Sequence, residues 1–316
     1  MKKAAFLLAM MTMIFFSCKK DHSASTIPSG KKYQVTFNVL NFQSKQSSLA
    51  LRTGSHLASG DTLTNLNGYL DVLYYVVYSS DGHAIRMPLM QDSTMSNMGT
   101  ITDSLPAGIY QVAIVTGKKG LAINSYGIIA NANFGYGNYL WQDTFWGTFT
   151  LTVGSGDNIN EAVLLSRVVG KLEVQILDNV PAAADSLSIT INPEILSKQI
   201  DQGSNNASTP TESFVYTVPI PASAKGKPNF TIDKLIGDTQ DINTITLAYK
   251  DASNHIVDTA KVINNVVFRN DTKTILSGNM CSGMMNGSQQ SFTVKADTAW
   301  GSDITLGFSL RLPKKP

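Results

Sequence analysis

Cysteine is scarce: the chain has 316 residues, and Cys18 and Cys281 are its only two cysteines. A single pair cannot supply the disulfide framework on which small secreted domains rely, nor a cysteine-rich metal site. The four histidines are scattered along the chain, without the close spacing of paired metal ligands. We therefore expect neither a disulfide framework nor a metal centre.

Charged residues are also sparse, at 15% of the chain, and the two signs nearly cancel. Of the 25 lysines and arginines, Lys2 and Lys3 lie in the amino-terminal segment described below, and without them 23 basic residues face 23 acidic ones. A chain near zero net charge lacks the basic surface of a nucleic-acid-binding protein. No nucleic-acid partner is expected.

Sequence signatures of catalysis are missing as well. The chain contains no H-E-x-x-H, no G-x-S-x-G and no phosphate-binding glycine loop. A pair of catalytic carboxylates cannot be recognised from sequence, because any two acidic residues can meet in space. We expect a protein that is not an enzyme and that needs no cofactor.

The amino terminus carries a short apolar run. Residues 1–3 are a basic start, and the thirteen residues 4–16 are uncharged and mostly apolar. A transmembrane helix needs about 20 residues, so this run fits the apolar region of a signal peptide instead. Ser17-Cys18 follows, a small residue directly before a cysteine, as in the bacterial lipobox. We expect residues 1–17 to be a lipoprotein signal peptide and Cys18 to carry the lipid.

Residues 18–31 are polar and contain serine, glycine and proline. Such a segment cannot bury enough apolar surface to offset the entropy lost on ordering. It is predicted to be a flexible tether between the lipid and a folded body. Lys19, rather than an aspartate, is compatible with sorting to the outer membrane. The expected location is therefore the cell outer membrane of a Gram-negative bacterium, with the folded body exposed at the surface.

Alternation of apolar and polar residues recurs along the chain and predicts strands with one buried and one solvated face, as in antiparallel sheets. The stretch 69–78 differs because it is almost entirely apolar, which predicts a central strand covered on both faces. Asp81-Gly82 after it indicates a turn. The alternating segments are residues 33–40, 148–153, 171–176, 213–218, 243–249 and 304–312.

A single β-sandwich of about 300 residues would be oversized, so the chain is expected to divide. Residues 154–158 form a loop-like stretch, and a new strand begins near Val168. The prediction is an all-β protein of two tandem antiparallel β-sandwich domains, residues 32–164 and 165–316.

Four segments, in order along the chain, resemble motifs of the fimbrillin superfamily of Bacteroidota. Residues 73–82 resemble its apolar strand with an Asp-Gly turn, and residues 105–110, Leu-Pro-Ala-Gly-Ile-Tyr, resemble its L-P-x-G-x-Y strand entry. Residues 165–174 resemble the L-x-R-x-x-(G/A)-K-x-x-V start of its second domain, and residues 269–279 its x-N-x-x-T-x-L-x-G strand. The resemblance covers most of residues 33–312 and is closest to the fimbrillin-A associated anchor and accessory lipoproteins.

This resemblance implies two transthyretin-like sandwiches and a role as a pilus anchor or accessory subunit, with other fimbrial subunits as partners bound by strand exchange. In the family, shaft subunits lose an amino-terminal strand to an arginine-specific protease, whereas anchor subunits keep their lipid. Arg52 is the candidate processing site, and an ordinary solvated arginine is the alternative. The motifs also have a structural interpretation: Pro106 and Gly108 suit a tight turn, and Arg167 would pair with a carboxylate or carbonyl beside the domain junction.

The segment 131–147 is unusually aromatic and includes Tyr136, Trp141 and Trp146. Exposed rings can stack on sugars, so one hypothesis is a glycan-binding platform on a carbohydrate-binding surface lipoprotein of a glycan-uptake system. The other interpretation, which we favour, places these rings in the core and at the edge of the first sandwich.

Overall fold

The computed structural model describes residues 30–43, 70–156, 158–201, 211–237, 242–281 and 292–297. Several expectations lie outside these ranges: the signal peptide and Cys18, the tether up to residue 29, Arg52, and the strand predicted over 304–312.

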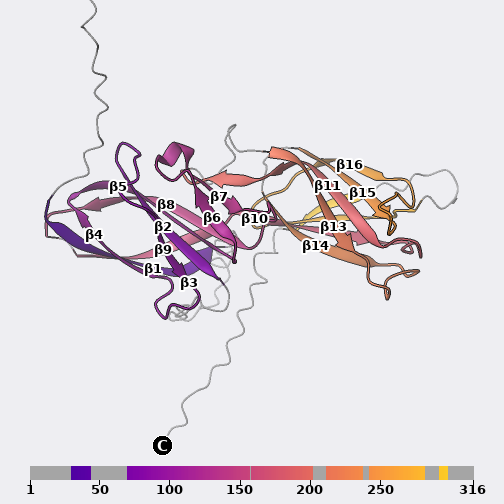
Figure 1. The fold of residues 1–316 in the computed structure, drawn as a ribbon, viewed down its shortest axis with the longest axis horizontal. Helices are drawn as coiled ribbons and strands as arrows, with labels where there is room; N and C mark the ends of the chain where they lie inside the picture. The colour runs from indigo at the N-terminus through magenta and orange to yellow at the C-terminus, as the bar shows by residue number, and fades with distance from the viewer. Residues whose placement is uncertain are drawn as a thin grey trace, which may run out of the picture.

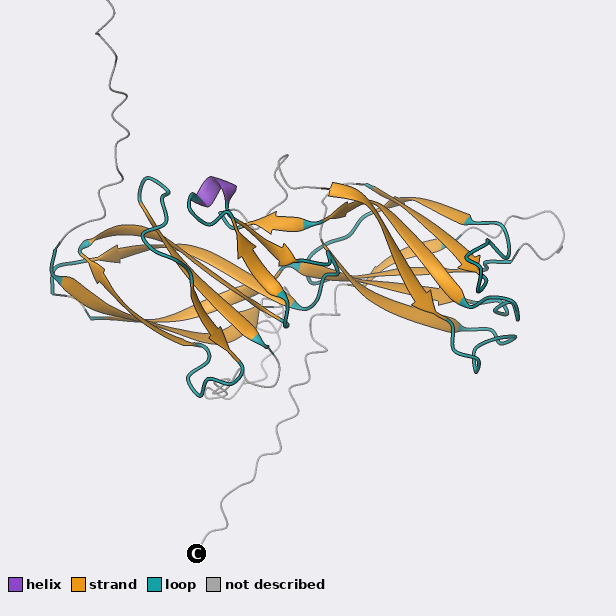
Figure 2. Ribbon diagram, viewed as in Figure 1, coloured by secondary structure: helices purple, strands orange, loops and turns teal. Residues whose placement is uncertain are grey.

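The described part is all β, as the sequence predicts. It consists of strands β1 to β18 and one 3-10 turn, Ile129–Asn131, and no helix in it is long and apolar enough to cross a membrane. Figures 1 and 2 show two β-sandwich units lying end to end along the long axis of the molecule.

The first unit contains a seven-stranded sheet in the order β3-β2-β5-β8-β9-β1-β4. Only two residue pairs, Phe145↔Arg167 and Trp146↔Ser166, join β8 to β9. The sheet bends at this narrow seam, so that β3-β2-β5-β8 faces β9-β1-β4 across a core that contains Phe37, Tyr75 and Leu165. The strands are β1 (Lys32–Gln43), β2 (Val72–Ser79), β3 (Leu89–Asp92), β4 (Thr100–Pro106), β5 (Gly108–Gly117), β8 (Thr144–Val153) and β9 (Ile159–Arg167).

A third layer covers the other face of β2 and β5. It is the small sheet β12-β7-β6, in which β6 (Leu121–Asn124) and β7 (Asn133–Tyr136) belong to the first unit and β12 (Ser197–Gln199) comes from the second. Val76 and Val115 pack against this layer, while Val77 and Val112 face the sandwich core. The predicted central strand buried on both sides is confirmed for residues 72–78; the strand begins at Val72.

The second unit is a two-layered sandwich of two four-stranded sheets, β14-β10-β17-β18 and β13-β11-β15-β16. Its core lies between them and includes Leu172, Ile189, Leu247 and Leu276. The strands are β10 (Val169–Ile176), β11 (Ser186–Ile195), β13 (Thr211–Pro219), β14 (Phe230–Gly237), β15 (Asn243–Lys250), β16 (Lys261–Val266), β17 (Lys273–Gly278) and β18 (Thr293–Asp297). The alternating segments predicted at 171–176, 213–218 and 243–249 all form strands.

The turns follow the sequence with one exception. Gly82 adopts a φ of 84°, and its N–H donates to the Ser79 carbonyl at 2.9 Å, as the Asp-Gly signal predicts. Gly108 is not among the glycines with positive φ. A Cβ there would instead lie 3.2 Å from the Tyr110 hydroxyl, which donates to the Pro106 carbonyl at 2.9 Å. Glycine at 108 therefore makes room for a ring.

Candidate functional site

The chain passes from the first sandwich to the second at Val168, between the end of β9 and the start of β10. Two of the segments with family-like motifs, 165–174 and 269–279, meet there. The Asp271 N–H donates to the Val169 carbonyl at 2.8 Å, and the Lys171 N–H donates to the Thr272 carbonyl at 2.9 Å. A Cβ at Gly170 would lie only 2.5 Å from the Arg269 carbonyl oxygen, so this close approach of backbones requires glycine.

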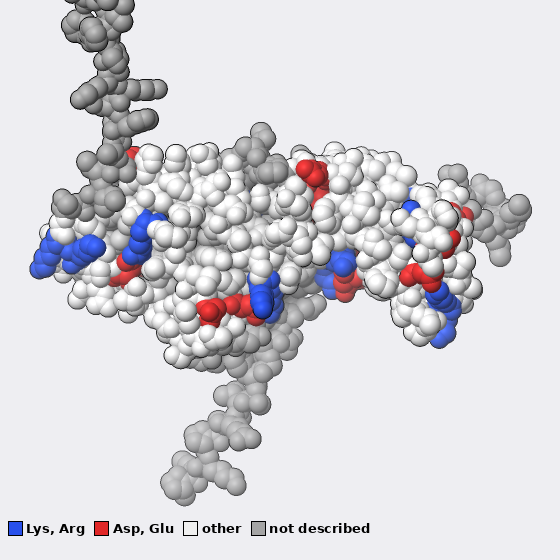
Figure 3. All heavy atoms as spheres, viewed as in Figure 1, with Lys and Arg blue, Asp and Glu red and all other residues white. Residues whose placement is uncertain are grey.

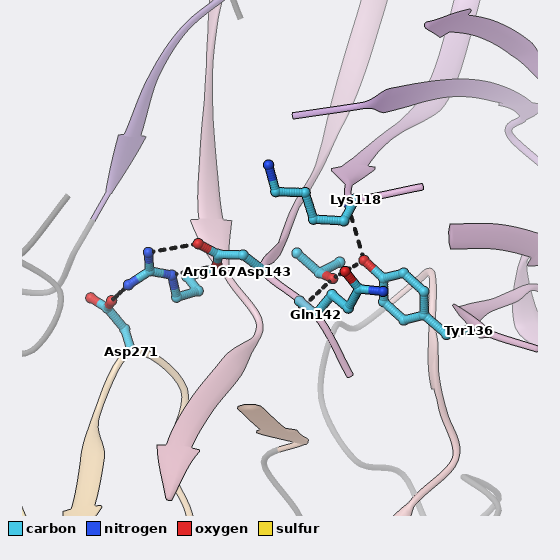
Figure 4. A network of polar contacts seen from close by, with 7 residues as sticks. Lys118, Tyr136, Gln142, Asp143, Arg167 and Asp271 are labelled. Atoms are coloured by element: carbon cyan, nitrogen blue, oxygen red, sulfur yellow. Dashed lines mark hydrogen bonds and ion pairs between the residues drawn. The ribbon is translucent and has the colours of Figure 1, made fainter. Parts of the chain in front are cut away.

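Arg167 is the central charged residue of this domain junction (Figure 4). Its side chain is 3% exposed and forms ion pairs with Asp143 and Asp271. Two nitrogens donate to the Asp143 carboxylate at 2.8 and 3.0 Å, and a third donates to Asp271 at 3.1 Å. The guanidinium carbon also lies 5.2 Å from the centre of the Phe145 ring. Asp143 precedes β8 and Asp271 precedes β17, so one buried cation contacts both units, as the structural interpretation of Arg167 predicted.

Both tryptophans of the aromatic segment donate hydrogen bonds to one stretch of the second unit. The Trp141 indole N–H donates to the Ile195 carbonyl at 2.7 Å, and the Trp146 indole N–H donates to the Ile200 carbonyl at 2.9 Å. Between these two acceptors the chain forms β12, which pairs with β7. The aromatic segment therefore anchors a return of the second unit onto the first.

Tyr136 lies beside Trp141, with ring centres 6.2 Å apart and the planes nearly perpendicular. Its oxygen accepts the Lys118 N–H at 3.2 Å and shares a hydrogen bond with the Thr144 hydroxyl at 3.0 Å. Burial raises the pKa of this phenol. Tyr136 and Trp141 are 4% and 5% exposed, so neither ring offers a free face to a sugar. The structure brings the predicted glycan residues together. Tyr136 and Trp141 are core residues, as the favoured interpretation expected, but the three rings lie at the domain junction and not at a sheet edge.

Two charged residues that the sequence reasoning missed are buried next to the junction. Lys198 of β12 is 1% exposed, and its ammonium donates to the Asn270 amide oxygen at 3.0 Å. Glu194 of β11 is fully buried and accepts the Gly237 N–H at 3.1 Å. Desolvation raises the pKa of Glu194 to about 8, so its carboxyl is mostly protonated at neutral pH. Both charged residues lie in an apolar stretch that includes Ile195, Leu196 and Ile200, and this pattern could have indicated from the sequence that they are buried.

These contacts position the two domains relative to one another. Among the described residues, no group of three or more His, Cys, Asp or Glu side chains is placed to bind a metal ion. On the face shown in Figure 3, charged side chains are few and lie in small mixed groups on a mostly uncharged surface.

The amino-terminal strand forms a second candidate site. β1 lies between β4, to which it is antiparallel, and β9, to which it is parallel. Its alternate residues Val35, Phe37 and Val39 are at most 2% exposed. The first strand of the chain therefore occupies the middle of a layer, where its removal would expose backbone edges on both sides and a row of core contacts.

The molecule is thus an all-β protein of two tandem sandwiches with a buried polar junction. No family model and no curated protein matches it by sequence. Its fold is similar to that of a Bacteroides ovatus protein described as a "putative adhesin", with a TM-score of 0.51, 10% identity, and coverage of 74% of this chain and 82% of that one. It is also similar to the "putative polysaccharide binding proteins" of Bacteroides thetaiotaomicron, with a TM-score of 0.52, 11% identity, and coverage of 79% and 92%.

The fimbrial anchor protein Mfa2 from Porphyromonas gingivalis matches with a TM-score of 0.47 and 10% identity, over 84% of this chain and 98% of that one. At 10% and 11% identity, the two Bacteroides structures show that this chain shares their all-β fold, the fold class that the sequence predicts.

Proposed function

We propose that this protein is a structural, lipid-anchored subunit of a surface pilus, acting as an anchor or accessory subunit that binds neighbouring subunits by strand exchange. The observation that carries the proposal is the position of β1 between β4 and β9. An incoming strand with apolar residues at alternate positions would regain the main-chain hydrogen bonds on both sides and refill the places of Val35, Phe37 and Val39.

The order of features along the chain supports this proposal. Cys18 and the polar tether precede β1, and Arg52 follows it. A retained lipid at Cys18 would hold the chain at the outer membrane through β1, and a neighbouring subunit's strand would have to displace β1 from its slot. Cleavage after Arg52 would separate β1 from the rest of the chain and open the slot between β4 and β9. The two states correspond to an anchor and to a polymerising subunit.

The mass of the intact protein from its native envelope distinguishes these states. An acylated chain beginning at Cys18 is the expected result for an anchor or accessory subunit. An unlipidated chain beginning at Thr53 would overturn the anchor role and make the protein a shaft or tip subunit.

Strand exchange is tested with a chain beginning at Thr53 and a labelled peptide of residues 30–43. The peptide is expected to bind and to raise the thermal stability of the chain. A peptide with Phe37→Asp is the matched control, because it keeps the backbone donors but places a charge in the core, and it should not bind. Equal binding of the two peptides, or of neither, would refute strand exchange in this slot.

A second candidate function is glycan binding, favoured by the fold shared with proteins described as polysaccharide-binding. Tyr136 and Trp141 are buried, so a sugar site would need exposed residues elsewhere. A glycan array probed with the intact protein tests this function. Binding that survives Trp146→Phe would place the site away from the domain junction. If the protein bound no glycan, the structural function would be the one that remains.

A further inference from the structure

The described sheets end in edge strands, and most of these carry features that discourage pairing with another strand. β3, β6 and β12 have four, four and three residues. β14 carries Asp233 and Lys234, and β18 carries Lys295 and Asp297. β16 contains Asn265 with a φ of 60° and a register shift against β15.

β4 is protected by side chains of neighbouring elements. The Gln91 amide donates to the Thr100 carbonyl at 2.8 Å and accepts the Gly99 N–H at 2.9 Å. Farther along the strand, Asp103 is paired with Arg86. The Gln91 side chain therefore occupies a position beside the start of β4 that an added strand would need, and Asp103 adds a charge within the strand.

β13 has fewer of these features: its one register shift against β11 lies near its start, and its charged residue, Glu212, and its proline, Pro219, lie near the two ends. It has nine residues, Thr211–Pro219, and from Ser213 onward it carries no charge. It pairs with β11 on one side, and among the described residues no strand pairs with its other side. Val215, at its centre, is 52% exposed. A long, uncharged edge strand of this kind is a site for strand addition.

The order of residues in β13 identifies the partner. Around Val215 the strand reads Ser-Phe-Val-Tyr-Thr, which has the same residue classes in both directions: hydroxyl, aromatic, valine, aromatic, hydroxyl. We infer that β13 pairs with β13 of a second copy of this chain, antiparallel and centred on Val215. The two four-stranded sheets then join into one sheet of eight strands about a two-fold axis.

The five central residues of the strand form favourable cross-strand pairs in this register. Val215 faces the partner's Val215, Ser213 faces the partner's Thr217, and Phe214 faces the partner's Tyr216. Valine pairs, hydroxyl pairs and aromatic pairs all stabilise antiparallel strands. Glu212, the charged residue of the strand, faces Val218, so no like charges oppose each other.

The aromatic side chains are already arranged for such a pairing. Phe214 is partly buried against the core of the second sandwich, and its ring centre lies 4.9 Å from that of Tyr216 in an edge-on contact. A second β13 would cover the remaining exposed part of Phe214. The proposed contact lies in the second unit and leaves β1 in the first untouched, so it is independent of strand exchange there.

The first test measures mass against concentration for the chain from residue 19 onward, under reducing conditions so that Cys281 cannot cross-link. The mass is expected to rise from one copy to two between about 1 and 100 μM, the range of a weak interface. Val215→Lys places like charges directly opposite each other and should weaken association by about tenfold or more.

Val262→Lys is the matched control, because Val262 is 59% exposed on β16, the opposite edge strand of the same sheet, and should leave association unchanged. Mixing Val215→Lys with Val215→Glu should restore association beyond that of either variant alone. The circular dichroism of each lysine variant should match that of the wild type, so that a loss of association reports on the interface and not on folding.

The second test fixes the register by cross-linking in a Cys281→Ser background. Val215→Cys should form a covalent dimer on oxidation, because directly opposed residues are about 4.5–5.5 Å apart between Cα atoms. Thr217→Cys should not, because the two residues 217 would be about 13 Å apart along the strands.

Three results would overturn the inference. These are a monomer at every concentration, equal effects of Val215→Lys and Val262→Lys, and equal cross-linking through positions 215 and 217. If the chain dimerised only after residues 298–316 were deleted, the inference would also be overturned for the full chain, because the β13 edge would then bind residues 298–316 of the same molecule.

Discussion

The two sandwiches differ in how many faces of their sheets are covered. In the first, β2 lies between two apolar layers, and the consecutive residues Val76 and Val77 are each 1% exposed. In the second, the middle of β11 alternates: Ile189 and Ile191 face the sandwich core and are fully buried, whereas Thr190 between them is half-buried. The pattern of a strand therefore reports the number of layers that pack on it, rather than its place in the sheet order.

Substitution at the junction between the two units is expected to cause the largest loss of stability. Arg167→Ala would remove the guanidinium from two carboxylates, of which Asp271 is 5% exposed. Removing one partner of a buried ion pair costs about 3–5 kcal/mol. We expect a loss of that size in the free energy of unfolding, measured in urea, together with separate transitions for the two units.

Lys295→Ala, on the exposed strand β18, is the control for this change and should stay within about 0.5 kcal/mol. A single, nearly unshifted transition for Arg167→Ala would show that the ion pairs do not couple the units.

The layer difference itself is tested by neighbouring substitutions. Val76→Ala and Val77→Ala should each lower the free energy of unfolding by about 2 kcal/mol, because each leaves a cavity in a different core. In β11, Ile189→Ala should cost about 2–5 kcal/mol and Thr190→Ala less than about 0.5. Chemical denaturation of the four variants gives the comparison. A small effect at Val76 would mean that the third layer is not packed as described.

Glu194 gives the second unit a pH dependence. Its folded-state pKa of about 8 lies above the ordinary value of 4.5, so the folded protein retains a proton that the unfolded chain releases. Stability is fully present below about pH 4.5 and falls as pH rises toward 8, by at most about 1.4 kcal/mol per pH unit.

Glu194→Gln should remove this slope and make the protein more stable than the wild type at pH 8, as urea titrations across the range would measure. Glu161→Gln, on the exposed part of β9, is the matched control. If the Glu194→Gln variant kept the slope of the wild type, the assignment of the pH dependence to this carboxyl would be contradicted.

A modest effect on stability is expected at Trp146. Trp146→Phe keeps an aromatic ring but loses the hydrogen bond to the Ile200 carbonyl, which costs about 1 kcal/mol. Hydrogen exchange should speed up in β12 and β7 while the second-unit core stays protected. Unchanged exchange at residues 197–199 would show that β12 is held by other contacts.

The local pattern of apolar and polar residues was sufficient to predict many of the strands. Strand periodicity located β1, β8, β10, β13 and β15, and the apolar run at 69–78 indicated coverage on both faces of β2. These features depend on residues near each other in sequence, whose alternation is imposed by the geometry of a strand. Gly108 shows where prediction from local pattern fails. Glycine is needed at this position because the Tyr110 ring lies close to it, and not because of the backbone angle at residue 108.

The candidate site was harder to predict from the sequence than the strands were. Aromatic content marked Tyr136, Trp141 and Trp146, but stacking on a sugar and packing at a domain junction use the same residue types. Trp141 and its acceptor Ile195 are 54 positions apart, and nothing local in either segment indicates the other. Glu194 and Lys198 could have been noticed as charges in an apolar stretch.

The sequence by itself determined the all-β class, the central strand β2 and the presence of an arginine suited to the domain junction, because each follows from local geometry and charge. Only the tertiary structure decided that 195–200 returns to the first unit, that Asp143 and Asp271 share Arg167, and that β13 ends its sheet. These depend on which distant strands become neighbours, a choice made by the packing of whole layers and not by any one segment.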